Sequence, residues 1–312
     1  MRDRSDRGFT LIELLVGLLL GTIILSAAIT FLITHMRSLE GSDTRENVAR
    51  NDRYVGALLR RDLQLAGIGI KSGTRYGTLS VWPGTSGDTL IVLYVPYQPE
   101  PAPLHPVDPT ESQPADAGEG TCGPRCIEVL YDPTKPKELL VGDLARMEVE
   151  GVRRLVLIND LRIDGPEWEI EWTEADSLLH QPAGLTGTPN VQLKVPGTFV
   201  QKLAVVIFYL DGERLMRADE LNLDGSPSGQ VVAYGVEEFD ISLIFADGDT
   251  LGRANPSDTD YSNDYDDIAG VIAVVTVRAS RVDPRVNNGQ LVRKTSEWRV
   301  SPRNLRYEKN RY

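Results

Sequence analysis

A run of 25 apolar residues near the N-terminus, residues 9–33, constrains this chain more than any other feature. It reads FTLIELLVGLLLGTIILSAAITFLI and holds one charged residue, Glu13. As an α-helix the run would be about 37 Å long, enough to cross a hydrocarbon core of about 30 Å. A cleaved secretory signal has a shorter apolar region, and a buried core helix is rarely apolar on all faces. We therefore expect residues 9–33 to form a transmembrane helix.

Basic residues lie on both sides of this run. Arg2, Arg4 and Arg7 precede it, and Arg37 and Arg45 follow it. The positive-inside rule counts Lys and Arg close to the ends of a membrane span. The difference of one residue favours a cytoplasmic N-terminus only weakly.

The composition changes after residue 33, where charged residues begin to alternate with apolar ones. Apolar residues then recur at spacings of seven, three and seven, which places them on one helical stripe: Val48, Val55, Leu58 and Leu65. Gly67 and Gly69 supply a stop signal. Residues 34–69 are therefore predicted to be an amphipathic helix that lies on another part of the protein.

We expect the amphipathic segment to continue the membrane helix without a break. One helix over residues 9–66 would be about 87 Å long. Alternatively, Gly41 interrupts it, and Asp43 with Glu46 forms a capping box at which a second helix begins.

The rest of the chain, residues 70–312, has the alternation and turn signals of strands. Asp211 and Gly212 mark the turn of one hairpin. Residues 96–120 hold seven of the chain's 19 prolines, so we expect a surface loop there and no central strand. The expected strands are 78–82, 89–95, 126–131, 145–150, 153–158, 167–172, 191–195, 202–210, 213–218, 239–245, 270–280 and 294–300. The predicted fold class is α+β, with a long N-terminal helix packed against antiparallel sheet in one β-rich domain.

The chain carries 33 basic and 45 acidic residues, for a formal charge of −12. Nucleic-acid binding requires clustered Lys and Arg, and no such block is present. We therefore expect no nucleic-acid partner.

The start of the chain resembles the class III signal of type IV prepilins and pseudopilins. The resemblance rests on a charged leader, then Gly8, Phe9, Thr-Leu-Ile-Glu13 and an unbroken apolar helix. Later segments resemble minor pilins of the PilW type, including the tail SEWRVSPRNLR: residues 57–69, 232–249, 271–281 and 296–306. The resemblance implies a pilin-like fold and a non-enzymatic role in assembling or priming a type IV pilus.

The same resemblance implies how the chain is processed and where it is located. A prepilin peptidase would cut between Gly8 and Phe9, remove leader residues 1–8 and N-methylate Phe9. The N-terminus would be cytoplasmic, the helix would cross the inner membrane, and residues 70–312 would be periplasmic before entering a pilus at the cell surface. The implied partners are this peptidase, membrane lipid, other minor and major pilins, and the inner-membrane assembly machinery.

The position of Glu13 near the predicted cleavage site has a physical explanation. Cleavage creates a cationic amine at Phe9, and Glu13 follows it by four residues, which is one helical turn. A lone carboxylate costs about 2.5–3.5 kcal/mol at the bilayer centre, and an amine would relieve that cost. The resemblance implies that this amine belongs to a neighbouring subunit and sets the assembly register. The alternative is that Glu13 only reaches the lipid headgroups.

Two cysteines, Cys122 and Cys126, have the spacing C-x3-C. This differs from the C-x-x-C of thioredoxin-like sites, and a zinc site would need two more ligands. In an oxidising periplasm we expect a local disulfide that rigidifies the end of the Pro-rich segment.

The segment 246–267 holds seven aspartates. Calcium prefers several carboxylate oxygens, so its candidate ligands here are Asp247, Asp249, Asp258 and Asp260. The segment lacks EF-hand spacing, and a solvated acidic loop is the alternative. No other cofactor is expected.

Two other functions stay open. A minor pseudopilin of a type II secretion system, of the J kind, shares the same N-terminus. A single-span periplasmic enzyme could carry a similar anchor, but the chain's histidines are scattered at positions 35, 105 and 180 without a catalytic grouping.

Overall fold

The computed structural model describes most of the helix and strands of the chain. The described residues are 10–70, 72–73, 77–96, 103–107, 112–114, 126–130, 132, 139–149, 152–165, 167–174, 190–192, 197–255, 262–280, 282 and 289–305. Two compact units divide the chain. The first is Met1–Arg50 with Arg278–Arg293, and the second is Asn51–Val277 with Lys294–Tyr312.

Helix α1, Leu11–Leu63, is one continuous helix of 53 residues. This agrees with the expected continuation of the apolar helix into the amphipathic segment, and the alternative of a second helix that restarts at Asp43 is wrong. Glu46 does not cap a helix and instead pairs with Arg50 one turn later, at 3.4 Å on the exposed face. The helix ends at Leu63, earlier than the predicted boundary at residue 69. Turns follow it, and in them Gly67 and Gly69 have φ of 78° and 69°, a region that glycine adopts without steric cost.

The predicted apolar stripe of α1 is largely confirmed. Val48 is 4%, Val55 0% and Leu58 7% exposed, while Leu65 is half-buried. Leu59 and Leu63, at 1% and 0%, are buried as well. The buried face is therefore wider than the stripe, as is usual for a helix packed on a sheet.

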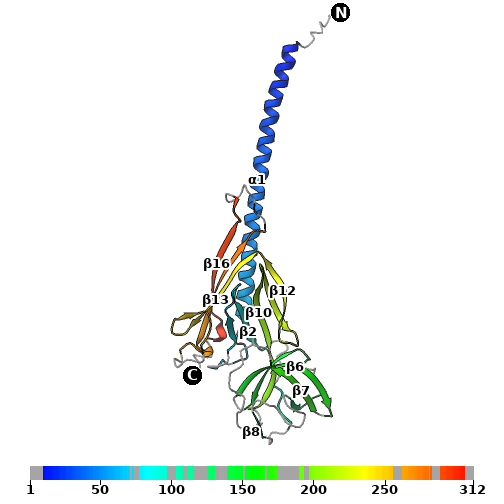
Figure 1. Ribbon diagram of the computed structural model, residues 1–312, viewed down its shortest axis with the longest axis vertical. Helices are drawn as coiled ribbons and strands as arrows, with labels where there is room; N and C mark the ends of the chain where they lie inside the picture. Colours follow the sequence, from blue (N-terminus) through cyan, green and yellow to red (C-terminus); the bar gives the residue numbers. More distant parts are fainter. Residues whose placement is uncertain are drawn as a thin grey trace, which may run out of the picture. The chain divides into compact units, whose positions relative to one another are not determined.

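The first sheet of the second unit has five antiparallel strands (Figure 1). Its order is β1-β2-β10-β11-β12. The predicted hairpin joins β10 to β11 through Gly212 and Glu213, and Gly212 has φ of 61°. The strands are β1 Leu79–Trp82, β2 Thr89–Tyr94, β10 Ala204–Asp211, β11 Arg214–Leu221 and β12 Pro227–Tyr234.

The second sheet has the order β14-β13-β15-β16. Asp88, just before β2, connects it to the first sheet. The Asp88 backbone N–H donates to the Phe239 carbonyl at 2.8 Å, and its Oδ2 accepts from the Ile241 N–H at 2.7 Å. The elements are β13 Val236–Phe245, β14 Thr250–Leu251, the 3-10 helix Tyr265–Asp267, β15 Ile268–Arg278 and β16 Arg293–Val300.

A third sheet has the order β4-β7-β6-β5-β9, and residues 104–107 close it into a ring. On one side the Leu104 N–H donates to the Val200 carbonyl of β9 at 2.8 Å. On the other side the Val107 N–H donates to the Glu128 carbonyl of β4 at 3.1 Å. The result is a small antiparallel β-barrel. Its strands are β4 Cys126–Leu130, β5 Leu144–Val149, β6 Val152–Asp164, β7 Glu167–Glu174 and β9 Phe199–Lys202.

The prediction that residues 96–120 are only a surface loop is therefore wrong in part. Pro106 lies opposite Val129 of β4. The hydrogen bond at this position is made by the residues next to them, because the Leu130 N–H donates to the His105 carbonyl at 3.1 Å. A proline is tolerated between two strands at such a position because its missing N–H is not used. Within the same predicted loop, β3, Ser112–Pro114, pairs with β8, Asn190–Gln192.

Two hydrophobic clusters involve the described strands of the barrel. One lies between the first sheet and one side of the barrel: Ile70, Ile91, Leu93, Val95, Leu144, Leu155, Leu157, Leu203, Val205, Ile207, Ala218 and Leu221. The other fills the barrel: Ile127, Val129, Leu139, Ala145, Met147, Val156, Ile158, Trp168, Ile170, Trp172 and Val200.

The α+β prediction is confirmed, and each expected strand has a counterpart. The strand expected over 202–210 is split, because Leu203 donates to the Leu144 carbonyl while β10 begins to pair with β2 at Ala204. Strand β12 was not expected. Its half-exposed, Gly- and Ser-containing sequence lacks the clear apolar alternation that marks the other strands.

Candidate functional site

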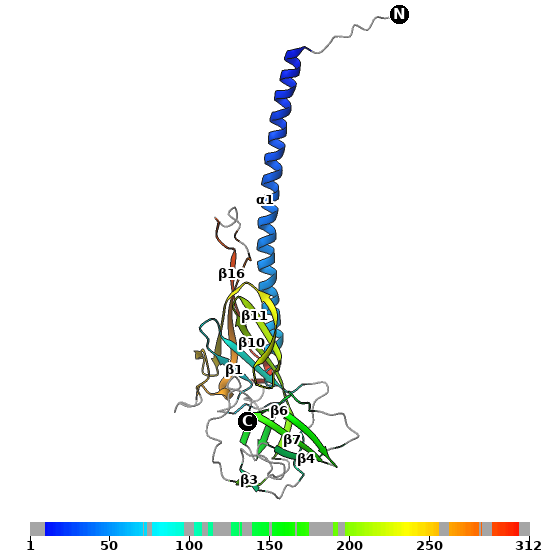
Figure 2. The same ribbon diagram turned by 45° about the vertical axis from the view of Figure 1, so that its right-hand side comes forward.

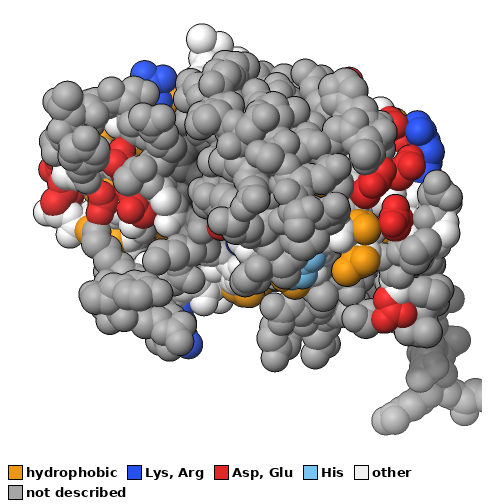
Figure 3. Space-filling model, turned by 90° about the horizontal axis from the view of Figure 1, so that it is seen from below, with side chains coloured by type: hydrophobic (Ala, Val, Ile, Leu, Met, Phe, Trp, Pro, Cys, Tyr) orange, Lys and Arg blue, Asp and Glu red, His pale blue; other side chains and the backbone are white. Residues whose placement is uncertain are grey.

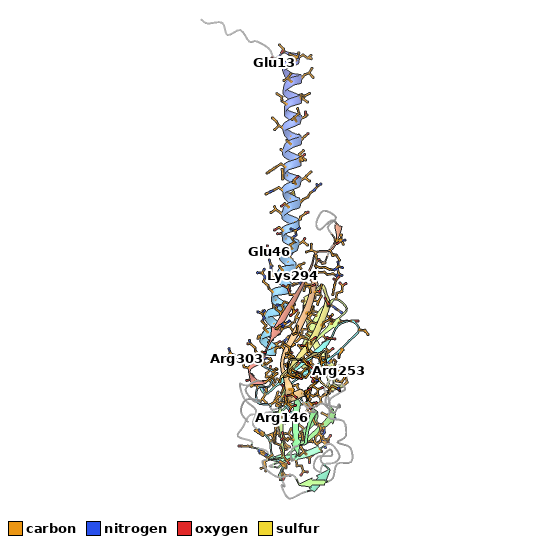
Figure 4. All side chains as sticks on the ribbon, turned by 90° about the vertical axis from the view of Figure 1, so that its left-hand side faces the viewer. Glu13, Glu46, Arg146, Arg253, Lys294 and Arg303 are labelled. Carbon is orange, nitrogen blue, oxygen red and sulfur yellow. The ribbon has the colours of Figure 1, made fainter. Side chains whose placement is uncertain are left out.

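The first turn of α1 holds the one acidic residue of the apolar run (Figure 4). The Thr10 N–H donates to Oε2 of Glu13 at 3.1 Å, and the Thr10 hydroxyl donates to the same oxygen at 3.0 Å. In return, the Glu13 N–H donates to the Thr10 hydroxyl at 3.4 Å. Thr10 and Glu13 therefore form a reciprocal capping box, which satisfies backbone N–H groups that helix geometry leaves unpaired.

Sequence reasoning missed this role of Glu13, although the signal was present. The pattern Thr-x-x-Glu immediately before an apolar run is the usual signature of a capping box. Gly8 and Phe9, the predicted cleavage and methylation residues, lie outside the described residues. The predicted cut therefore stays a prediction.

The apolar half of α1 is exposed on every side. Among the described residues, this is the one helix long and apolar enough to cross a membrane. Burying one Leu or Ile side chain stabilises by about 1.5–3 kcal/mol, so this surface requires an apolar surrounding. Its large side chains are 43% to 80% exposed: Leu11, Ile12, Leu14, Leu15, Val16, Leu18, Leu19, Leu20, Ile23, Ile24, Leu25, Ile29, Phe31, Leu32, Ile33, Met36 and Leu39.

The last turns of α1 are bound to the first sheet by a buried ion pair. The Asp62 side chain is 1% exposed, and its Oδ2 accepts from Nε of Arg217 on β11 at 2.6 Å. Arg217 also binds Asp219 at 2.9 Å. Burial acts to lower the pKa of Arg217, but the hydrogen bonds to Asp62 and Asp219 outweigh it and raise that pKa. Burial raises the pKa of the neighbouring Tyr94 phenol, and Asp62 adds to this effect.

A second buried carboxylate binds α1 to the second sheet. Asp52 lies 2.5 Å from Nζ of Lys294 on β16, and the Asp52 side chain is 4% exposed. One turn later, Gly56 leaves room for the Trp298 ring, since a Cβ there would lie 2.5 Å from Trp298 Cε2. The tail SPRNLR, singled out in the sequence, closes the helix end, because the Asn304 amide donates to the Ala66 carbonyl at 3.3 Å.

The candidate calcium ligands are only partly described. Asp247 accepts a hydrogen bond from the Asp249 N–H at 3.0 Å in the turn between β13 and β14. Asp258 and Asp260 lie outside the described residues. Among the residues that are described, no group of three His, Cys, Asp or Glu side chains could hold a metal ion. The calcium site stays a prediction.

Cys126 begins β4, is 0% exposed and takes part in a disulfide. The sequence has one other cysteine, Cys122, which lies outside the described residues. The rigidifying role expected of this bridge stays a prediction.

Comparisons with known proteins support the prediction that was made from the N-terminal residues. Residues 3–29 match the model of the prokaryotic N-terminal methylation motif. No curated protein matches the sequence. A solved type IV-like pilin from Thermus thermophilus is similar at 10% identity, with a TM-score of 0.36 over 82% of this chain and 97% of that one. The family match is confined to the N-terminal segment, where it supports a prepilin-type methylation motif.

Proposed function

We propose that this protein is a minor pilin of the PilW kind that helps to assemble or prime a type IV pilus. The observation that carries the proposal is the methylation motif at residues 3–29, placed on a helix whose first half is apolar and exposed. A helix of this kind can move from a lipid surrounding to a bundle of similar helices without exposing apolar surface to water. The proposed role is structural and involves no catalysis.

The geometry of Glu13 supports a role in assembly. Before cleavage, Thr10 holds the Glu13 carboxylate at the start of α1 through Oε2. Cleavage between Gly8 and Phe9 would place a new amine next to Thr10 in the chain. A carboxylate already fixed at the helix start can then accept a bond from that amine, or from the same amine of a neighbouring subunit, with little loss of side-chain freedom.

The proposed location follows from the predicted cleavage after Gly8 and from the exposed apolar surface of α1. The N-terminus would be cytoplasmic, α1 would cross the inner membrane, and the β-rich part would be periplasmic before incorporation into the pilus. The proposed partners are the prepilin peptidase, inner-membrane assembly proteins, membrane lipid, and other minor and major pilins.

A chromosomal Glu13→Ala variant tests this function. We expect a band of mature size on a gel, because the cut lies before Glu13, together with a clear loss of surface pili counted by electron microscopy. Gly8→Ser should block the cut and leave the longer precursor. A strain that lacks the gene and keeps normal pili but loses type II secretion would contradict the proposal and indicate a pseudopilin.

A further inference from the structure

The barrel is inserted between two strands that are neighbours in the first sheet. β2 and β10 pair antiparallel over five residue pairs, from Phe208 opposite Leu90 to Ala204 opposite Tyr94. The chain therefore leaves the sheet after Tyr94 and returns directly opposite the same residue at Ala204. Two residues could join these ends as a hairpin. The first sheet therefore needs no residue of 95–203 for the pairing of β2 with β10.

The described strands of the insert form a closed sheet of their own. Residues 104–107 complete the ring between β9 and β4, so the third sheet has no open edge there. The ring encloses a separate apolar cluster that includes Met147, Ile170 and Trp172, each at most 3% exposed. Figure 2 shows β4, β6 and β7 grouped apart from β1, β10 and β11. A closed barrel with its own core has the means to fold as a unit.

The inserted residues also differ in charge from the rest of the chain. Residues 95–203 contain 18 Asp and Glu against 9 Lys and Arg, a net charge of −9 out of −12. The remaining residues carry only −3. Figure 3 shows several groups of Asp and Glu side chains on one face of the molecule and fewer Lys and Arg. Like-charged inserts on adjacent subunits would repel one another, whereas the nearly neutral remainder would not.

A shared apolar cluster joins the insert to the first sheet. Leu144, Leu155 and Leu157 of the barrel belong to the same cluster as Ile91 and Leu93 of β2. Deleting the barrel would expose this surface and could prevent folding for that reason alone. A test must therefore disrupt the barrel inside the full chain.

We propose that residues 95–203 form an inserted β-barrel domain that folds as its own cooperative unit and takes no part in filament packing. Assembly then depends on α1 and the first two sheets. The filament part of this inference rests on the proposed function, whereas the folding part does not.

Two matched substitutions in the full chain test this inference. Ile170 on β7 and Ile207 on β10 are both 0% exposed and lie in central strands of the barrel and of the first sheet. In Ile170→Asp, hydrogen exchange should become on the order of 100-fold faster at barrel amides and stay unchanged in β10, β13 and β15. Piliation of this strain should equal that of the wild type. Ile207→Asp should instead remove protection from β10 and abolish piliation.

Each result decides a part of the inference. If Ile170→Asp removes protection from β10 and β13 as well, the barrel is not a separate unit. If the faster exchange in Ile170→Asp is confined to the barrel but pili are lost, the barrel takes part in filament packing. If pili form normally even without the gene, the proposed function is wrong, while the exchange pattern still decides whether the barrel folds by itself.

Discussion

The two ends of α1 place carboxylates in opposite surroundings. Glu13 lies in an apolar, fully exposed stretch and is satisfied locally by Thr10 one turn away. Asp62 lies among buried side chains and is satisfied by Arg217, which comes from a strand 155 positions later in the sequence. A carboxylate in lipid can use only its own helix or a partner subunit, whereas one at the folded end can use the sheet. The first carboxylate is satisfied within its own helix, and the second fixes the end of the helix to the first sheet.

The largest expected effect comes from breaking the buried pair at the folded end. The Arg217 side chain is only 17% exposed, and Asp62→Ala removes the main partner of its guanidinium. Removing one partner of a buried pair costs about 3–5 kcal/mol. We expect a loss of unfolding free energy near the lower end of that range, measured by urea denaturation in detergent.

The matched control is Asp219→Ala, which removes the other carboxylate bound to Arg217. Its side chain is 61% exposed, so the loss should stay below about 1 kcal/mol. Equal losses for the two variants would contradict the distinction between buried and exposed partners.

A smaller effect is expected where α1 contacts Trp298. Gly56→Ala forces a Cβ to within 2.5 Å of the Trp298 ring, and such overpacking costs about 1–3 kcal/mol. Thermal unfolding should show the loss. In a Trp298→Ala background the same change should become neutral or stabilise by up to about 1 kcal/mol, because Ala favours a helix more than Gly. A cost that persists without the Trp298 ring would mean that Gly56 is required for another reason.

The smallest effect concerns a carboxylate that faces other acids. Burial, then Glu238 and Asp88, raise the pKa of Asp240 on β13. A raised pKa means that the folded state binds the proton more tightly, so the ionised Asp240 opposes folding at high pH, and this cost disappears at low pH, where the carboxyl is protonated in both states. Because the residue is exposed, Asp240→Asn should stabilise by no more than about 0.5 kcal/mol at pH 7.

The pH dependence of this variant gives the check. Below about pH 4, the ordinary pKa of Asp, the two proteins should have equal stability in urea titrations. An advantage for Asp240→Asn that grows as the pH falls would contradict the stated sign.

The sequence predicted the parts of the fold that depend on local pattern. The apolar run, the stripe through Val55 and Leu58, and the turn at Gly67 all follow from helix period and glycine conformation. The capping-box rule was applied at Asp43, inside the helix, and not at Thr10, where it holds. Local pattern alone does not say which match marks a helix start, because a helix can continue through a capping sequence when packing supports it.

Long-range pairing could not be predicted in this way. Residues 104–107 are proline-rich, yet β9 and β4 supply their hydrogen bonds from distant parts of the chain. Asp62 and Asp52 are buried beside Arg217 and Lys294, which come from distant strands. No spacing within α1 reveals those partners.

The measurement that tests the central claim most directly is mass spectrometry of the N-terminal peptide of the protein isolated from membranes. The account predicts a peptide that begins at Phe9 and carries one N-methyl group, with residues 1–8 absent. A peptide that begins at Met1, or one that begins near Ala28 within the apolar run, would contradict it.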